Sequence, residues 1–462
     1  MNKLAGLFWL RLFLGCGAPV AAQNPQLTID EAALIADTKS VEADGYNYNH
    51  GLLSLLPNIM VKGNGDLNPV SGAAIPLGRF TATYIRGTTT GNTVTLSTSL
   101  NQSMTSSLLE SSLLSDGLFK VKYEAPALSQ ATWLAGTYSN TLAYTLSAIG
   151  IGASVTPAQV TMTVIVPAFI NASSISAAPA NMELTVNDLK YFRNTTLEFS
   201  NAFQLRHTVP VQLTVAATSS PQMDFTNSYP GVADPQTSIG KIQVQMGAVT
   251  VPLGTTSQPL VANAPVLQGN KTDFNARFFI SPTDLKAGFI NKGSYKTTVV
   301  LQGTGTSGPA ATYNKNVDLL VTVNDLSELV VSATDVTLSF QSAENYKNGV
   351  AVDMANHLRV SKTTPYDISV KALAADFTGA GAASGVTLPV GILELGPASG
   401  QTGVNTISAL SATDQLLVSS ALPAVDRYLN IRYRVPASGT QYLINKPAGT
   451  YVVNIRYTLT AH

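Results

Sequence analysis

The chain has little cysteine, tryptophan and charge, and each scarcity removes a class of function. Cys16 is its single cysteine, and charged residues make up 12% of 462 residues, with 27 basic and 27 acidic side chains. Such sparse and balanced charge gives no net field that would favour nucleic acid or acidic lipid. Without its first 22 residues the chain contains no cysteine, so disulfides and thiolate chemistry are excluded and packing alone must hold each domain.

Familiar catalytic and metal-binding patterns are also missing. The four histidines stand singly, without H-E-x-x-H or His-x-His spacing, at His50, His207, His357 and His462. A zinc site is therefore not expected, and each histidine is interpreted as a surface or structural residue. The sequence has no G-x-S-x-G elbow and no G-x-x-x-x-G-K-[ST] loop, the commonest hydrolase and nucleotide-binding signatures. A dispersed serine triad or carboxylate pair would escape this search.

Two Asx-rich turns offer oxygen atoms of the kind that calcium binds. They contain Asp44, Asn64, Asp66 and Asn68. Neither turn follows the full 12-residue calcium loop, and turn formation explains both stretches without a metal. We therefore expect no metal, no cofactor and no enzymatic activity.

The N-terminus, "MNKLAGLFWLRLFLGCGAPVAAQ", has the pattern of an export signal. Lys3 precedes an apolar run, and Val20-Ala21-Ala22 supplies the small residues of a cleavage site after Ala22. Arg11 interrupts the apolar run, which argues against a retained membrane span. Cys16 is an alternative site for a bacterial lipid anchor. The prediction is an exported chain at the cell surface, outside the cell or in the periplasm.

A long repeat runs through the chain. "AGTYSNTLAYTLSA" from Ala135, "KGSYKTTVVLQGTG" from Lys292 and "AGTYVVNIRYTLTA" from Ala448 share a Gly-x-Tyr start, with the tyrosines 157 and 156 positions apart. Upstream of each, an aromatic residue lies three positions before a proline, in "YEAP" at Tyr123, "FISP" at Phe279 and "YRVP" at Tyr433. A fixed period of this length indicates tandem domains.

The repeated segment has the alternation of a strand. In the last copy Tyr451, Ile455 and Leu459 fall on one face, while Asn454 and Arg456 fall on the other. Period two with one apolar face predicts a half-buried antiparallel strand. Other runs rich in Val, Thr and Ile are strand-like too, and the best helical stretch is a Ser/Leu-rich one from Gln102.

Many short strands in repeats of this length predict an all-β chain of three tandem immunoglobulin-like antiparallel β-sandwich domains. The expected division is a signal peptide at 1–22 and repeats at 23–167, 168–325 and 326–462. Linkers are expected at Val166–Ala180 and near Asn324.

The Gly-x-Tyr start has a structural interpretation. In immunoglobulin-like sandwiches a tyrosine near the start of strand F turns its hydroxyl back to upstream backbone. We expect such a corner in all three copies, although each tyrosine could equally fill an ordinary core position. The residues concerned are Gly136, Tyr138, Gly293, Tyr295, Gly449 and Tyr451.

The third repeat is expected to lack its last strand. After the Gly-x-Tyr strand the first two copies continue into "AQVTMTVIVP" at Ala158 and "KNVDLLVTV" at Lys315, and the third copy stops before such a strand. With the export signal and the C-terminal Gly-x-Tyr strand, this pattern resembles the subunits of bacterial chaperone-usher pili, including spore-coat-U-type pilins. It is also similar to cysteine-free secreted repeat proteins of Bacteroidota-type bacteria. The pilin resemblance implies an incomplete sandwich that a segment of a neighbouring subunit fills.

An unfilled edge would either recruit a strand or be protected. The candidate donor within the chain is the segment from Gln26, with Leu27, Ile29, Ala33 and Ile35 on alternate positions. The other interpretation is a complete smaller sheet, or an edge that a segment of the third repeat itself fills.

The leading functional hypothesis is an exported structural or adhesive surface protein, a pilus-like subunit that uses strand donation. Its expected partners are other surface proteins or further copies of itself. The alternatives are a surface glycan-binding module and, less favoured, a secreted hydrolase. Carbohydrate sites use exposed aromatic platforms, and the candidates are Trp133, Tyr46, Tyr48, Tyr191, Tyr346, Tyr366 and Tyr442.

Overall fold

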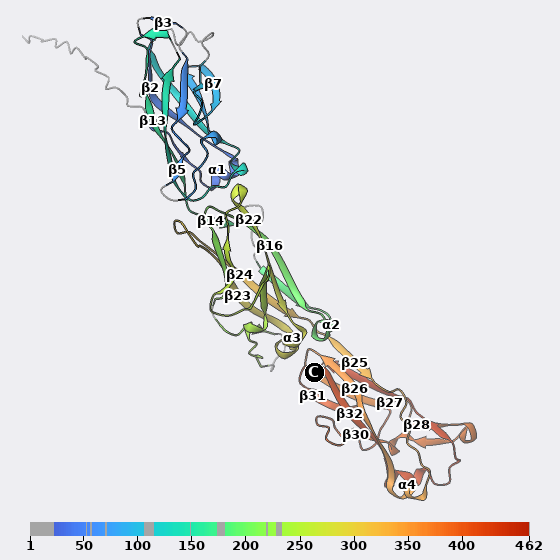
Figure 1. Cartoon of the computed structure of the whole chain (residues 1–462). Coiled ribbons are helices and arrows are strands. Elements are labelled where there is room, and N and C mark those ends of the chain that lie inside the picture. Colours follow the sequence, from blue (N-terminus) through green and yellow to red (C-terminus); the bar gives the residue numbers. More distant parts are fainter. Residues whose placement is uncertain are drawn as a thin grey trace, which may run out of the picture.

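The computed structural model describes residues 23–51, 53–55, 58–69, 72–105, 115–147, 149–172, 181–218, 220–227 and 233–461. The expected signal peptide with Cys16, His462 and most of the Ser/Leu-rich stretch lie outside these residues; of that stretch Gln102–Ser103 form a strand, β8. Strands in mostly antiparallel sheets dominate the described part, which confirms the all-β class. Figure 1 shows three β regions following one another along an elongated molecule.

Each β region has its own core, and we name the regions accordingly. Buried residues from Leu27 to Val166 form the core of the N-terminal unit. Those from Ile170 to Val323 form the core of the middle unit, and those from Leu358 to Val435 form the core of the C-terminal unit. The units are joined by the three-residue connectors 167–169 and 324–326. Within the expected linker Val166–Ala180, residues 170–172 form the strand β14, and residues 173–180 lie outside the described residues.

The N-terminal unit consists of two packed sheets. Their strand orders are β1-β13-β10-β4-β8, with β5 on β10, and β12-β2-β9-β6-β7, and β3 pairs with β11. β13 runs antiparallel to β10 and parallel to β1. The strands are β1 (Gln26–Thr28), β2 (Thr38–Asn49), β3 (Leu53–Leu55), β4 (Ile59–Gly63), β5 (Asn68–Pro69), β6 (Thr81–Arg86), β7 (Thr89–Thr95), β8 (Gln102–Ser103), β9 (Gly117–Pro126), β10 (Gly136–Leu146), β11 (Ile149–Ile151), β12 (Ser154–Thr156) and β13 (Gln159–Val166).

The middle unit repeats this arrangement. Its sheets have the orders β14-β16-β22-β19-β20 and β15-β24-β23-β17-β21, with β18 on β23. β24 again runs antiparallel to β23 and parallel to β15. The strands are β14 (Ile170–Ala172), β15 (Asn181–Val186), β16 (Leu197–His207), β17 (Val211–Ala217), β18 (Asp224–Thr226), β19 (Gln243–Met246), β20 (Val249–Pro252), β21 (Gln258–Ala264), β22 (Lys271–Ile280), β23 (Gly293–Gly305) and β24 (Thr312–Val323).

The C-terminal unit has smaller sheets, β25-β26-β32-β30, β31-β27-β34 and β29-β28-β33. Its strands are β25 (Ser327–Val331), β26 (Gly349–Lys362), β27 (Tyr366–Ala372), β28 (Asp376–Ala380), β29 (Thr387–Pro389), β30 (Glu394–Pro397), β31 (Gln415–Ala421), β32 (Ala424–Pro436), β33 (Thr450–Val452) and β34 (Ile455–Ala461). β33 and β34 together occupy the repeated Gly-x-Tyr segment.

Helices are short and cap the ends of the units. They are α1 (Glu31–Ala36), α2 (Lys190–Arg193), α3 (Pro282–Gly288) and α4 (Ala343–Asn348). α3 begins where the Ser281 hydroxyl accepts a hydrogen bond from Asp284 N and proline occupies the first turn, both typical of helix starts. Over the described ranges, no helix has the length and apolarity needed to cross a membrane.

Candidate functional site

The Gly-x-Tyr strand has a different environment in the C-terminal unit. In the middle unit β23 lies between β17 and β24, and in the N-terminal unit β10 lies between β4 and β13. In the C-terminal unit β34 pairs with β27 and is the last strand of its sheet. Among the described residues, no strand occupies the place that β13 and β24 take in the other units.

The core-facing side chains of this strand are consequently less buried. Tyr295 and Val299 are 0% exposed and Leu301 is 4% exposed in β23. The corresponding Tyr451, Ile455 and Tyr457 are only partly buried against the core of the C-terminal unit. In the middle unit β24 covers these positions, since Val321 pairs with Tyr295 and Val317 pairs with Val299. Without such a neighbour, one apolar row stays half exposed to water.

A second half-exposed apolar row faces the same core from residues 335–341. Val336, Leu338 and Phe340 alternate with exposed residues and pack against the core, but this segment has no strand pairing in the described structure. Its counterpart in the middle unit is β15, in which Met182, Leu184 and Val186 are buried. β15 is held by parallel pairing with β24. We call the two rows together the open edge, comprising Val336, Leu338, Phe340, Tyr451, Val453, Ile455, Tyr457 and Leu459.

Sequence reasoning named the β34 half of the open edge and missed the other half. The signal was present, because "DVTLSF" at residues 335–340 alternates apolar and polar residues. It also lies 154 positions after "NMELTV" at residues 181–186. Period two would have marked it as a strand-like segment.

The three repeat tyrosines each make an equivalent hydrogen bond. Each hydroxyl donates to the backbone carbonyl four residues upstream: Tyr138 to Leu134 at 2.8 Å, Tyr295 to Asn291 at 3.0 Å, and Tyr451 to Pro447 at 2.9 Å. Burial raises the pKa of Tyr138 and, above its ordinary range, that of Tyr295. The hydroxyls of Tyr138 and Tyr295 therefore stay protonated and act as donors.

Lack of space explains two of the three glycines of this motif, Gly293 and Gly449, whereas a Cβ on Gly136 would meet only the Tyr138 ring at an ordinary 3.5 Å. Gly293 has a φ of 149°, and a Cβ there would lie 2.6 Å from the Thr226 carbonyl oxygen. A Cβ on Gly449 would lie 2.8 Å from the Ala383 Cβ. Both distances are shorter than a side chain tolerates, so the chain can pass here only as glycine.

A tyrosine and histidine cluster lies behind the open edge. The Tyr433 hydroxyl contacts both the Tyr457 hydroxyl and, at 2.7 Å, Nε2 of the buried His357. Burial raises the pKa of Tyr433 to about 12 and lowers that of His357. In the N-terminal unit Tyr123 similarly contacts the hydroxyls of Tyr46 and Tyr144. The cluster pairs three polar side chains inside the C-terminal unit, while Nδ1 of His357 is buried without a hydrogen-bond partner among the described residues.

The candidate donor segment lies within its own unit. Leu27 and Ile29 are fully buried, and β1 pairs in parallel with β13. Ala33 and Ile35 belong to α1, where Ala33 is buried and Ile35 is 57% exposed. The expectation of one alternating strand through all four residues is therefore wrong, because the Asp30 side chain accepts from Ala33 N and starts a helix.

The histidines and acidic turn residues have structural contacts. His207 is buried, with Nδ1 2.7 Å from the Val209 carbonyl and Nε2 2.8 Å from the Thr272 hydroxyl. Asp66 accepts a hydrogen bond from Leu77 N, and Asp44 pairs with Lys120. In the portion of the chain that the structure describes, no three His, Cys, Asp or Glu residues are grouped as metal ligands.

Most of the aromatic candidates for glycan binding are inside the protein. Trp133, Tyr46, Tyr48 and Tyr366 are at most 1% exposed, so they form no surface platform. Tyr191 is partly buried against the middle core. Tyr346 and Tyr442 are exposed, at 39% and 48%, at the far end of the C-terminal unit.

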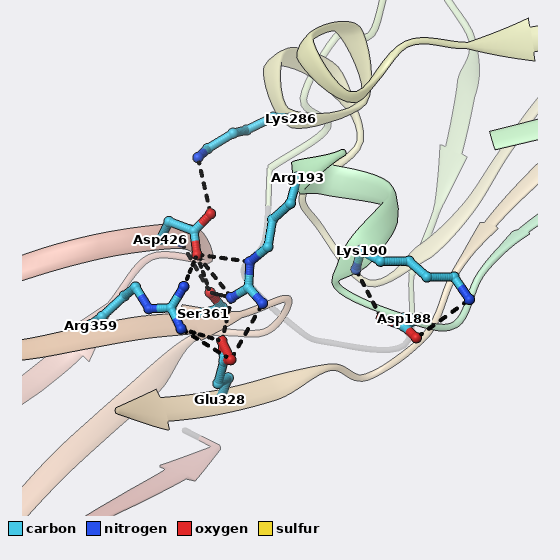
Figure 2. A network of polar contacts seen from close by, with 8 residues as sticks. All are labelled: Asp188, Lys190, Arg193, Lys286, Glu328, Arg359, Ser361 and Asp426. Carbon is cyan, nitrogen blue, oxygen red and sulfur yellow. Dashed lines mark hydrogen bonds and ion pairs between the residues drawn. The ribbon is translucent and has the colours of Figure 1, made fainter. Parts of the chain in front are cut away.

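A charged cluster joins the middle and C-terminal units (Figure 2). Arg193 of α2 donates to both Glu328 and Asp426, and Lys286 of α3 lies 3.5 Å from Asp426. Arg359 also contacts both carboxylates, at 3.4 Å. Burial would raise the pKa of the Asp426 carboxyl, but the hydrogen bond from Arg193 and the surrounding positive charges lower it. The cluster holds the two units together.

Comparison with known proteins gives a likeness in fold only. No family model matches the chain, and no curated protein matches it. Among solved structures, the CsuC–CsuE chaperone–tip adhesion subunit complex of archaic chaperone-usher Csu pili from Acinetobacter baumannii contains a similar chain. It is 12% identical with a TM-score of 0.29, over 61% of this chain and 99% of that chain.

Two further structures come from enterotoxigenic Escherichia coli. CfaE, the adhesive subunit of CFA/I fimbria, is 10% identical with a TM-score of 0.24, over 66% of this chain and 100% of that chain. The CooA pilin subunit is 12% identical with a TM-score of 0.22, over 34% of this chain and 98% of that chain.

Proposed function

We propose that this protein is an exported structural or adhesive surface protein whose C-terminal unit accepts an extended strand from another polypeptide. The observation that carries the proposal is the open edge, where two apolar rows are only partly buried. The same rows are buried by β13 and β24 in the other two units. A sheet edge with unpaired backbone groups beside apolar pockets is a site for strand addition.

The other two units define what the accepted strand must look like. Val160, Met162 and Val164 of β13, and Val317, Leu319 and Val321 of β24, point inward at every second position. Both strands run antiparallel to the Gly-x-Tyr strand. The accepted strand is therefore a segment of about eight to twelve residues with apolar side chains on alternate positions, antiparallel to β34.

Strand acceptance suits a subunit of a fibre or surface assembly. The backbone hydrogen bonds along the edge would supply affinity, and the alternating side chains would supply register. Glycan binding is less favoured because four of the seven aromatic candidates are buried. The first residues of the described chain do not serve as donor here, since Leu27 and Ile29 complete the N-terminal unit.

Amide hydrogen exchange with an added peptide tests the proposal. A peptide with the β24 sequence, residues 312–323, is added to the full chain, and exchange of residues 455–461 is measured. Slower exchange of β34 is expected, because its free backbone groups gain partners. A matched peptide with aspartate in place of Val317, Leu319 and Val321 should have no effect.

A variant of the chain provides the second control. Ile455→Asp puts a charge into the open edge, so the β24 peptide should no longer slow exchange of β34. If neither peptide changes exchange in the unaltered chain, the edge is not a strand acceptor and the proposal fails.

A further inference from the structure

The two joints between units are built from the same backbone hydrogen bonds. At the first joint Ala135 N donates to the Thr208 carbonyl at 2.8 Å, across the two units. Thr208 also binds the connector, through its N to Phe169 O at 3.2 Å and through its hydroxyl to Pro167 O at 2.7 Å. Its hydroxyl accepts from Phe169 N at 3.1 Å.

The second joint repeats all four bonds. Lys292 N donates to the Thr363 carbonyl at 2.7 Å, and Thr363 N donates to Leu326 O at 3.2 Å. The Thr363 hydroxyl donates to Asn324 O at 2.8 Å and accepts from Leu326 N at 2.8 Å. Thr208 and Thr363 each begin a Thr-x-Pro turn, after β16 and after β26.

The side chains around the two joints differ. At the first joint Asn270 accepts from Trp133 N at 3.0 Å and donates to the Trp133 carbonyl at 2.7 Å. At the second joint the charged cluster of Figure 2 takes this place. A shared backbone frame with different side chains indicates that the frame, and not one particular residue pair, defines how one unit docks on the next.

The C-terminal unit carries a third copy of the donor side of this joint, the residue before the Gly-x-Tyr motif. Ala448 precedes Gly449 as Ala135 precedes Gly136 and Lys292 precedes Gly293, and Tyr451 makes the same bond to Pro447. Ala135 and Lys292 are partly buried at their joints, whereas Ala448 is exposed. Exposed apolar side chains share this end of the unit: Tyr346 at 39%, Tyr442 at 48%, Ile444 at 57% and Val452 at 53%.

At each joint, the unit that docks follows directly in the chain after the strand that pairs with the Gly-x-Tyr strand of the preceding unit. β13 enters β14 of the middle unit after three residues, and β24 enters β25 of the C-terminal unit after three residues. The first and third of these residues make the connector bonds to Thr208 and Thr363. The strand that completes the sheet of one unit therefore also positions the next unit against the end of that unit.

We propose that the end of the C-terminal unit formed by residues 437–449 docks a further β-sandwich unit, namely the one that directly follows the strand on the open edge. This inference rests on the proposed function. Ala448 N donates to the carbonyl of a threonine in that unit, within a Thr-x-Pro turn after the strand that corresponds to β16 and β26. The N-terminal unit of this chain is not that partner, because the sequence "HGLLSLLPN" that follows β2, at residues 50–58, has no threonine.

A chain extended by one unit tests the docking. Gly305 and Ala461 hold equivalent places, so a second copy of residues 306–461 is appended after residue 461, with Cys16→Ser throughout. This gives the C-terminal unit a copy of β24 followed by a copy of itself, as the middle unit has in the natural chain. Exchange of the original residues 455–461 reports strand completion.

Introduced cysteines report docking separately. The test pair is Ala448→Cys with Thr363→Cys of the appended copy, and the reference pair is Lys292→Cys with Thr363→Cys of the original copy. The 2.7 Å bond of the reference pair leaves its Cα atoms no more than about 6.5 Å apart, within disulfide range. A mismatched pair, Ala448→Cys with Ser384→Cys of the appended copy, measures random contact.

The expected result is slow exchange of β34 and a test-pair disulfide that forms within about tenfold of the reference rate, with none in the mismatched pair. Slow exchange without the test disulfide would overturn the docking and leave strand acceptance intact. Fast exchange of β34 without the disulfide would overturn both proposals.

Discussion

The middle and C-terminal units carry the same strand in two different environments. Tyr295 and Val299 of β23 are completely buried, while Tyr451 and Ile455, at equivalent positions, are only partly buried. The two segments have the same alternation of apolar residues. The degree of burial is therefore set by the neighbouring strand β24, present in one unit and without a counterpart in the described part of the other. Alternation identifies the face that will be covered but not what covers it.

Truncation of the corner tyrosine should give the largest difference between these units. Tyr295→Ala removes a ring that packs against Phe225 and Phe289 at centroid distances of 4.6 and 5.0 Å. We expect a loss of about 3–5 kcal/mol in the middle unit. Tyr451→Ala removes a half-exposed ring and should cost about 1–2 kcal/mol. Chemical denaturation followed by amide exchange of each unit measures both values.

The same pair also reports filling of the open edge. With the β24 peptide bound, the cost of Tyr451→Ala should rise toward that of Tyr295→Ala, because the ring becomes covered. Tyr428→Ala, at an exposed position of β32, is a suitable control and should change little. Equal costs for Tyr295→Ala and Tyr451→Ala without peptide would contradict the difference in burial.

The charged joint should give the next largest effect. Asp426→Asn leaves Arg193, Arg359 and Lys286 facing one fewer negative charge in a cluster that is only partly exposed. We expect the free energy of unfolding to fall by about 1–2 kcal/mol, less than for a fully buried ion pair, because water reaches the cluster. Calorimetry should also show the middle and C-terminal units unfolding less cooperatively.

A matched exposed pair separates this effect from ordinary surface charge. Asp353 binds Arg432 at 2.6 Å, and both side chains are about two-fifths exposed, at 41% and 42%. Asp353→Asn should therefore cost no more than about 1 kcal/mol. If Asp426→Asn costs as little as Asp353→Asn, the charged cluster does not hold the joint.

More of the fold than of the candidate site could be predicted from the sequence. Period-two runs and the repeat spacing predicted the strands, because these patterns depend on nearby residues. The aromatic-x-x-Pro register did not predict equivalent environments. Tyr123 and Tyr433 are buried, whereas Phe279 is only partly buried and the neighbouring Phe278 faces the core. Pro282 starts helix α3, while Pro126 and Pro436 end strands.

The remaining failures concern contacts between distant segments. The segment from Gln26 alternates like a donor strand, yet pairing of β1 with β13 more than 130 residues away keeps it in its own unit. Trp133 looked available for a ligand, but its backbone is bound by Asn270 of the next unit. Neither partner can be identified from local spacing, since long-range pairing depends on the whole topology.

Removal of the corner hydroxyl should have a smaller effect than removal of the ring. Tyr295→Phe leaves the Asn291 carbonyl without its donor in a largely buried site, and we expect a loss of about 1 kcal/mol. Tyr451→Phe should cost less than about 0.5 kcal/mol, because water can replace the hydroxyl at the exposed Pro447 carbonyl. Denaturation midpoints measure the difference. If Tyr295→Phe leaves the free energy of unfolding unchanged, the hydrogen bond of the corner does not contribute to stability.

Mild acid should have the smallest effect on stability, and it should destabilise both the middle and the C-terminal unit. Burial lowers the pKa of His207 in the middle unit and of His357 in the C-terminal unit below 6.5. As pH falls below about 6.5 the unfolded chain therefore binds more protons at these rings than the folded chain does, so stability decreases with falling pH. Amide exchange at pH 7 and pH 5.5 should show faster opening of both units at the lower pH. Replacement of one ring, by His207→Gln, should weaken this response in the middle unit and leave that of the C-terminal unit. An unchanged response in the middle unit of His207→Gln would mean that other groups cause it.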